Sequence, residues 1–196
     1  MNETKRVYNT ICNILYKIGN RLNDSKGKAI LSNLRNSIGK DISQVPIIWN
    51  IFFENLPDEY MESSKFEKEE KVILTILQLY AIYQQGELDN VFSSEGIKFS
   101  EALRKLRNTD NTESIDRRFN VMITASTYDE FVHHLRQMLK LLKSKSKYLE
   151  KINFALLGQD LYKIFKFEDN KIKINWGKQY YSYFNKDEKG DVQDDK

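Results

Sequence analysis

The chain has 196 residues, of which 40% are hydrophobic and 30% charged, with a formal net charge of +3. A chain of this length can bury one substantial core or two small bundles packed together. No apolar run approaches the ~18 residues that a membrane span requires. The single cysteine, Cys12, excludes an internal disulfide and suits the reducing cytoplasm. Only eight Gly and two Pro interrupt the chain, which favours long helices.

Charge is distributed unevenly along the sequence. Residues 1–40 hold eight Lys and Arg against two acidic residues, and residues 97–151 hold twelve against seven. Residues 41–96 have the opposite balance, with three basic residues against eleven acidic ones. Two basic zones separated by an acidic one predict a surface with an electropositive side and an electronegative side.

Hydrophobic periodicity predicts four helices in the first part of the chain, over residues 5–22, 26–38, 47–56 and 66–84. The polar run Asn23-Asp24-Ser25 separates the first two helices. Pro46 can occupy the first turn of the third helix, which Pro57 then ends. We expect the first part, residues 1–84, to form an N-terminal helical half.

The segment from Gln85 to Gly96 is rich in turn-forming residues and is predicted to be a connecting loop. Beyond it, five helices are predicted over residues 97–107, 114–126, 127–147, 154–165 and 176–184. Thr127 with Glu130 forms a capping box, Asn153 can cap the following helix, and Asn170 is placed in a turn. The expected fold is therefore all-α, with eight or nine helices in two packed halves. The second half spans 97–184, and a disordered tail follows over 185–196.

The helix predicted over 127–147 has two distinct faces. Its apolar face contains Phe131, Leu135, Met138, Leu139 and Leu142. The opposite face contains His133, Arg136, Lys140, Lys143 and Lys147, spaced by three and four residues. We expect the apolar face to pack on the core and the basic face to meet a negatively charged partner.

The sequence contains no recognisable active site. Neither a phosphate-binding G-x-x-x-x-G-K-[ST] loop nor a G-x-G-x-x-G motif occurs. His133 and His134 are adjacent, so on a helix they diverge by ~100° and cannot share a metal ion. Glu67 and Glu70 could bind magnesium for nuclease chemistry, but beside lysines at helical spacing they resemble a solvated face. We therefore predict no enzyme activity, no metal and no cofactor, with a metal-dependent nuclease as a remote alternative.

Basic residues on several predicted helices indicate binding to phosphate groups. The candidate residues are Lys28, Arg35, Arg104, Arg107, Arg117, Arg118, Arg136, Lys140 and Lys143. No helix carries the mixture of Asn, Gln and Arg that reads base edges, so contacts are expected to the nucleic-acid backbone. The competing interpretation is a helical protein–protein interaction module that never touches nucleic acid.

Seven segments in order resemble the CasB family, the small subunit of the type I-E CRISPR surveillance complex Cascade. They are 29–35 (AILSNLR), 79–84 (LYAIYQ), 97–103 (IKFSEAL), 115–119 (IDRRF), 134–142 (HLRQMLKLL), 152–161 (INFALLGQDL) and 176–180 (WGKQY). Each segment is weak alone, but their order over residues 26–184 makes the match specific. Two positions depart from the family pattern: Asn36 replaces a second arginine, and Ser100 replaces a glycine.

The resemblance implies an all-α, cytoplasmic, non-catalytic subunit that is present in two copies. It implies contacts with the backbones of the CRISPR RNA and target DNA, with CasC backbone subunits, with the CasA large subunit and with a second copy of itself. In that family the subunit holds the guide–target heteroduplex and follows the displaced strand of the R-loop. Matching the family's arginine positions assigns Arg35, Arg117, Arg118 and Arg136 to the nucleic-acid face.

Overall fold

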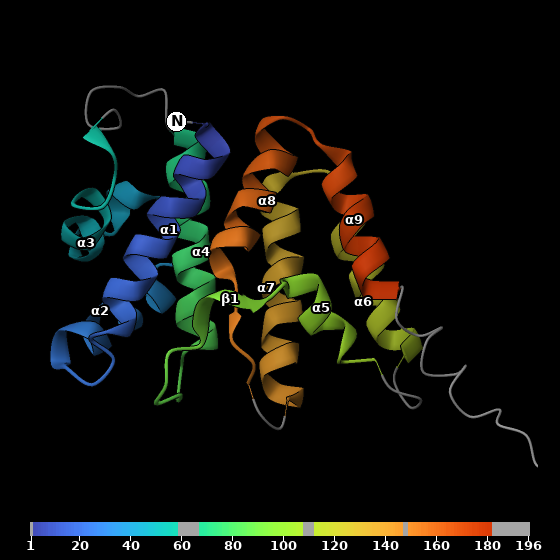
Figure 1. Cartoon of the computed structure of the whole chain (residues 1–196), viewed down its shortest axis with the longest axis horizontal. Coiled ribbons are helices and arrows are strands. Elements are labelled where there is room, and N and C mark those ends of the chain that lie inside the picture. The colour runs from blue at the N-terminus through green and yellow to red at the C-terminus, as the bar shows by residue number, and fades with distance from the viewer. Residues whose placement is uncertain (1, 59–66, 108–111, 147–148, 182–196) are drawn as a thin grey trace, which may run out of the picture.

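The computed structural model describes residues 2–58, 67–107, 112–146 and 149–181. Within these ranges the chain forms nine α-helices, two short 3-10 helices and one strand (Figure 1). The elements in order are α1 (Glu3–Gly19), α2 (Ser25–Asn36), η1 (Ile42–Gln44), η2 (Pro46–Ile48), α3 (Trp49–Phe53), α4 (Glu67–Tyr83), β1 (Phe92–Ile97), α5 (Phe99–Arg104), α6 (Thr112–Thr124), α7 (Tyr128–Lys145), α8 (Phe154–Lys166) and α9 (Asn170–Tyr181). The predicted all-α class is confirmed.

Helix α4 lies at the centre of the molecule. Every residue from Val72 to Tyr83 is buried, so the helix has no solvated face over these turns. Helices α1, α2, α7 and α8 all pack against it, which explains why a nearly uniform apolar run is stable there. At its first turn, the buried Arg6 of α1 binds Glu69 of α4 through Nη2 and Oε1, 3.0 Å apart. The central helix therefore fixes the positions of the helices around it.

Helix α8 joins the two predicted halves. It packs against α1 and α4 from the first part of the chain and against α9 from the second (Figure 1). Gly158 permits the close approach to α1, because a Cβ at this position would collide with Ile11. The buried apolar side chains of both parts form one continuous cluster. The division of the chain into two halves at residues 85–96 stays a prediction, and side chains from both predicted halves pack together in this cluster.

The predicted loop over 85–96 contains a strand that the sequence did not indicate. Phe92 and Ile97 of β1 each form a parallel bridge with Ile152. The Ile152 amide donates to the Val91 carbonyl, and the Ile97 amide donates to the Lys151 carbonyl, each at 3.0 Å. The sequence FSSEGI lacks the apolar alternation of a half-buried strand, and its pairing partner lies far away along the chain.

Three other predicted boundaries were wrong. The helix expected over 47–56 is replaced by η2 and the short α3. The helix expected over 97–107 is shortened to α5, which starts late because Ile97 pairs with Ile152 and which ends at Arg104. Helix α9 begins at Asn170 and not at Trp176. The turn lies at Glu168, which has a φ of 53°, and the Asp169 side chain accepts a hydrogen bond from the Lys171 amide at 3.1 Å.

The predicted helix caps mostly hold. Asn153 accepts from the Leu156 amide at 2.8 Å, and Thr127 accepts from the Glu130 amide at 3.2 Å. The Glu130 carboxylate accepts from the Ser126 amide at 3.1 Å, one residue earlier than in a regular capping box.

The predicted tail over 185–196 lies outside the described residues. Within the described ranges, no helix combines the length and the apolar character that crossing a bilayer requires.

Candidate nucleic-acid interface

Helix α7 has the two faces that its sequence predicts. Phe131, Leu135, Met138, Leu139 and Leu142 are all buried, where α7 packs on α4 and α6. On the other face, His133 and Lys140 are exposed, whereas Arg136 and Lys143 are half-buried. Lys147, at the end of the predicted stripe, lies outside the described residues. The amphipathic character of this helix is confirmed, and the basic face is available to a ligand over at least two turns.

Four of the nine candidate cations are exposed: Lys28 on α2, Arg117 and Arg118 on α6, and Lys140 on α7. Among the described residues, none of the four forms an ion pair with an acidic side chain. The sequence leaves open an ion pair of Arg117 with Glu113 or Asp116. Among the described residues neither pair forms, and Asp116 pairs with Arg107. Within the described part of the chain, no acidic side chain therefore neutralises these four charges, which can instead neutralise phosphates.

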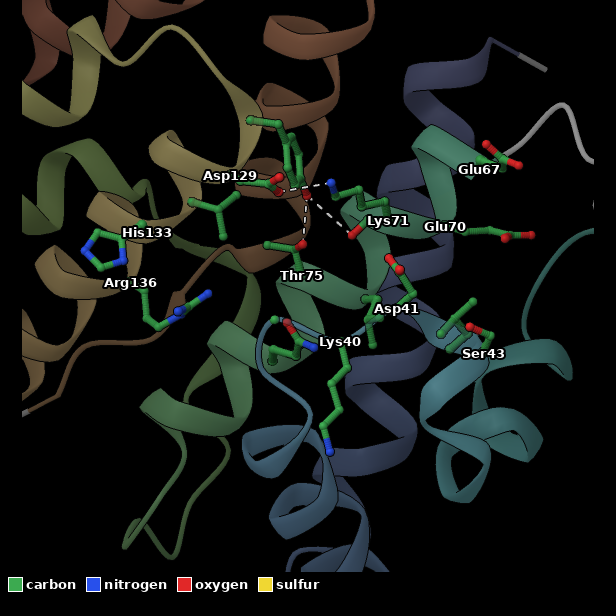
Figure 2. Close-up of a pocket in the computed structure, with 16 residues that line it drawn as sticks. Lys40, Asp41, Ser43, Glu67, Glu70, Lys71, Thr75, Asp129, His133 and Arg136 are labelled. Carbon is green, nitrogen blue, oxygen red and sulfur yellow. Dashed lines mark hydrogen bonds and ion pairs between the residues drawn. The ribbon is translucent and has the colours of Figure 1, made fainter.

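Arg136 lies in a cleft of about 750 Å³ between the segment 39–43, α4 and α7 (Figure 2). His133 and Arg136 line the α7 side of this cleft, and Glu67 and Glu70 line the α4 side. Burial lowers the pKa of Arg136 from its usual value, although a guanidinium stays charged at neutral pH. Burial raises the pKa of Glu70, and the neighbouring Glu67 and Glu69 raise it further. Two carboxylates thus lie on the α4 side of the cleft and a guanidinium on its α7 side, while Lys71 and Asp129 neutralise each other between them.

An ion pair and a tyrosine lie between the two sides of this cleft. Lys71 Nζ is 3.0 Å from Asp129 Oδ1, and the Tyr128 hydroxyl donates to Thr75 Oγ1 at 2.7 Å (Figure 2). Burial raises the pKa of Tyr128, so its hydroxyl stays protonated and keeps donating at neutral pH. Among the residues that the structure describes, no three His, Cys, Asp or Glu side chains lie close enough to hold a metal ion. The lining therefore combines cations and carboxylates within one cleft.

Arg35 and Lys143 bind the carboxyl end of α4. Arg35 Nη1 donates to the Ala81 carbonyl at 3.2 Å. Lys143 Nζ donates to the carbonyls of Tyr83 and Gln85 at 2.6 Å and 2.5 Å. Burial lowers the pKa of Lys143, the Glu87 carboxylate 3.9 Å away raises it in part, and the positive charge of Arg35 lowers it. Part of the hydrogen-bonding capacity of both candidates therefore serves the fold.

Arg107 has a structural role that its sequence position does not reveal. Its Nε and Nη2 atoms donate to the two carboxylate oxygens of Asp116 at 2.8 Å and 2.9 Å. The guanidinium lies over the rings of Tyr180 and Tyr181, and the side chain is only 8% exposed. It thereby joins the segment after α5 to α6 and α9. Arg104, on α5, is half-buried.

The segments behind the family resemblance also contain structural residues that site prediction did not single out. Trp176 Nε1 donates to Asp160 Oδ2 at 2.8 Å, and burial raises the pKa of that carboxyl group. Tyr180 stacks on Phe119 with ring centroids 3.9 Å apart. Ser100, at a family glycine position, is buried and its hydroxyl forms a hydrogen bond with Gln179. These contacts hold α5, α6 and α9 together, which positions the exposed arginines of α6.

The sequence model of the CRISPR-associated protein Cse2 matches residues 31–181. The chain belongs to the Cse2 family. Its fold is similar to the crystal structure of CasB from Thermobifida fusca, with 25% identity, a TM-score of 0.72, and coverage of 90% of this chain and 98% of that one. The resemblance to CasB in the sequence is therefore confirmed.

Two further solved structures share the fold of this Cse2 protein. A Cse2-family CRISPR-associated protein from Thermus thermophilus has 20% identity and a TM-score of 0.64, with 93% and 99% of the two chains covered. CasB from M. ruber has 18% identity and a TM-score of 0.67, with 91% and 98% covered. A search of curated protein sequences gives no match.

Proposed function

We propose that this Cse2 protein is a non-catalytic small subunit of a cytoplasmic type I-E CRISPR interference complex. Its partners would be the CRISPR RNA, the target DNA, CasC, CasA and a second copy of itself. It would stabilise the R-loop between guide RNA and target DNA, together with the displaced strand. The observation that carries the nucleic-acid role is the set of exposed cations without an acidic partner among the described residues, in a protein of a CRISPR-associated family.

We rank the expected contribution of each candidate residue to nucleic-acid binding by how exposed its side chain is. Lys28, Arg117, Arg118 and Lys140 are exposed, and Arg136 lines the α7 side of the cleft. These five would make the main phosphate contacts. Arg35 and Lys143 would add positive charge from fixed positions at the end of α4. Arg104 and Arg107 would contribute least, because they are half-buried and Arg107 is bound to Asp116.

A modest number of such contacts is enough for the proposed role. Replacing DNA–DNA pairing with RNA–DNA pairing is nearly balanced in free energy, so contacts to the backbone can shift the equilibrium toward the R-loop. Contacts to phosphates carry no sequence information, which suits a subunit that must serve many different guides. The carboxylates on the α4 side of the cleft would repel a strand and so limit its path to the α7 side.

The proposal is tested by measuring the binding of unrelated single-stranded DNA over a range of salt concentrations. The double variant Arg136→Ala, Lys140→Ala should weaken binding equally for all sequences and lower the salt slope by about 0.7 per lost phosphate contact. The matched control is Lys5→Ala with Lys68→Ala, which removes the same charge from exposed positions on α1 and α4. Equal effects of the two double variants would contradict the assigned face. An absence of any binding at low salt would favour the protein-interaction module.

A further inference from the structure

A second cleft lies on a different side of α2 from the candidate interface. This α1–α3 cleft has a volume of about 620 Å³ and is lined by Lys17, Asn20, Arg21, Lys26, Ala29, Ile30, Ile47, Asn50, Ile51 and Glu54. Lys26 and Ile30 face it from α2, whereas Lys28 is rotated from Lys26 by ~200° on the same helix. None of the nine candidate residues lines it. The cleft combines three cations and one carboxylate with an apolar floor.

The apolar floor makes this cleft a poor match for a nucleic-acid backbone. Ile47 is 59% exposed, and Ile30 and Ile51 lie beside it in the lining. The chemistry instead fits a protein segment that carries an apolar side chain between acidic residues, because the isoleucines and the three cations of the cleft then each have a complementary group.

The chain itself displays such a segment in the loop that follows α4. In this Leu88 loop (residues 85–90, QGELDN), Leu88 lies between Glu87 and Asp89 and is 85% exposed. No other large apolar side chain among the described residues is as exposed. Glu87 and Asp89 are exposed as well, and Glu87 Oε1 lies 3.9 Å from Lys143 Nζ of its own chain. No residue of the loop lines the α1–α3 cleft of its own chain.

The Leu88 loop is held in shape before any partner binds. The buried Gln84 donates through Nε2 to the carbonyls of Glu87 and Asp89 at 3.1 Å and 2.9 Å. Its Oε1 accepts from the Val91 amide at 3.0 Å, and Gly86 supplies a left-handed turn with a φ of 84°. A fixed loop loses little conformational freedom on docking, so the contact does not depend on a large buried area.

We propose that the Leu88 loop of one copy docks into the α1–α3 cleft of a second copy. Leu88 packs on Ile30, Ile47 and Ile51, and Asp89 pairs with the cations at the rim of the cleft, while Glu87 stays beside Lys143 of its own chain. Loop and cleft are different surfaces of the same chain, so the contact is heterologous and leaves one free loop and one free cleft in each dimer. This contact deepens the proposed function, on which it rests for the presence of two copies in one complex.

Disulfide trapping between two singly substituted chains tests this contact, because it detects weak association. In a Cys12→Ser background, a chain with Ile47→Cys is mixed with a chain with Leu88→Cys under mild oxidation. We expect cross-linking about tenfold faster than in a control that replaces Ile47→Cys with Val121→Cys on α6. Val121 is also an exposed apolar residue, at 44%, so the two pairs differ mainly in location. Equal rates in the two pairs would overturn the proposal.

A charge reversal and its compensation test the pairing directly. Arg21→Glu in the Ile47→Cys chain should slow the cross-link, and Asp89→Lys in the Leu88→Cys chain should restore its rate. Cross-linking rates that neither substitution alters would overturn the proposed contact. DNA binding by the Ile47→Cys and Leu88→Cys chains separates the two proposals, since neither Ile47 nor Leu88 is one of the nine candidate cations. If the Ile47→Cys and Leu88→Cys pair cross-links no faster than its control while both chains bind DNA, only the contact is overturned. If the pair cross-links faster than its control but neither chain binds DNA, only the nucleic-acid role is overturned.

Discussion

Arg35 of α2 and Lys143 of α7 bind the carboxyl end of the same helix, α4. Arg35 donates to the Ala81 carbonyl at 3.2 Å, and Lys143 donates to the Tyr83 carbonyl at 2.6 Å. The last carbonyls of a helix lack partners within the helix and lie at the negative end of its dipole. Two cations from different helices satisfy this end, and so they join α2 and α7 to the central helix.

Lys143→Ala should lower the free energy of unfolding by about 1–2 kcal/mol, because it removes charge-assisted hydrogen bonds to two helix-end carbonyls. Lys140→Ala is the matched control, since Lys140 is exposed on the same helix and its loss should cost less than about 0.5 kcal/mol. Urea unfolding of the two variants measures the difference. Equal destabilisation would show that Lys143 contributes no more than a surface lysine.

Arg107→Ala should lower the free energy of unfolding by about 2–3 kcal/mol, because it leaves the Asp116 carboxylate without its bidentate partner. The salt slope of DNA binding should stay at the wild-type value in this variant. Arg118→Ala, at an exposed position, should leave the free energy of unfolding almost unchanged and lower the salt slope of DNA binding. If Arg107→Ala keeps the wild-type free energy of unfolding but lowers the salt slope of DNA binding, Arg107 contacts DNA.

Arg117→Ala and Arg118→Ala should each lower the salt slope of DNA binding by about 0.7 to 0.9, the contribution of one phosphate contact. Replacement by lysine should retain the slope and lose some affinity, because lysine keeps the charge without the planar fork. Titrations of DNA at several salt concentrations measure both quantities. If the lysine variants bind as weakly as the alanine variants, charge alone does not explain the contact.

Asp160→Asn should change stability in a pH-dependent way. Burial raises the pKa of Asp160 in the folded protein above its ordinary value of 3.8. As the pH rises above that value, the unfolded chain loses the proton first, so the wild-type protein loses stability until the pH passes the folded-state pKa. The asparagine variant keeps an acceptor for the Trp176 indole and carries no such penalty. Its stability relative to wild type should therefore rise between pH 3 and pH 7, as measured by urea unfolding at each pH.

Local sequence signals predicted several elements correctly. The α7 pattern of Phe131, Leu135 and Leu142 places one face on the core because helical spacing alone determines which side chains share a face. The caps at Thr127 and Asn153 need only a side-chain oxygen and an amide three residues later. Each of these features depends on residues within two helical turns, so the linear pattern contains it.

Features that depend on distant partners escaped prediction. Strand β1 forms because Phe92 and Ile97 each pair with Ile152, and no local sequence pattern predicts that pairing. Helix α9 begins at Asn170 where a turn was expected, since Glu168 adopts the positive φ that reverses the chain. Asn has a weak helix propensity, which packing of α9 on α5 and α8 overrides.

The sequence by itself determined that this protein is helical and that α7 has a basic outer face, because both properties follow from residue type and spacing. The sequence also resembles CasB, through seven segments that occur in the same order as in that family. Only the tertiary structure decided which cations are free. Arg107 and Arg117 look alike in the sequence, but Arg107 lies against Asp116 and two tyrosines, whereas Arg117 is exposed to solvent. The difference arises because ion pairs and burial depend on side chains that meet across the fold.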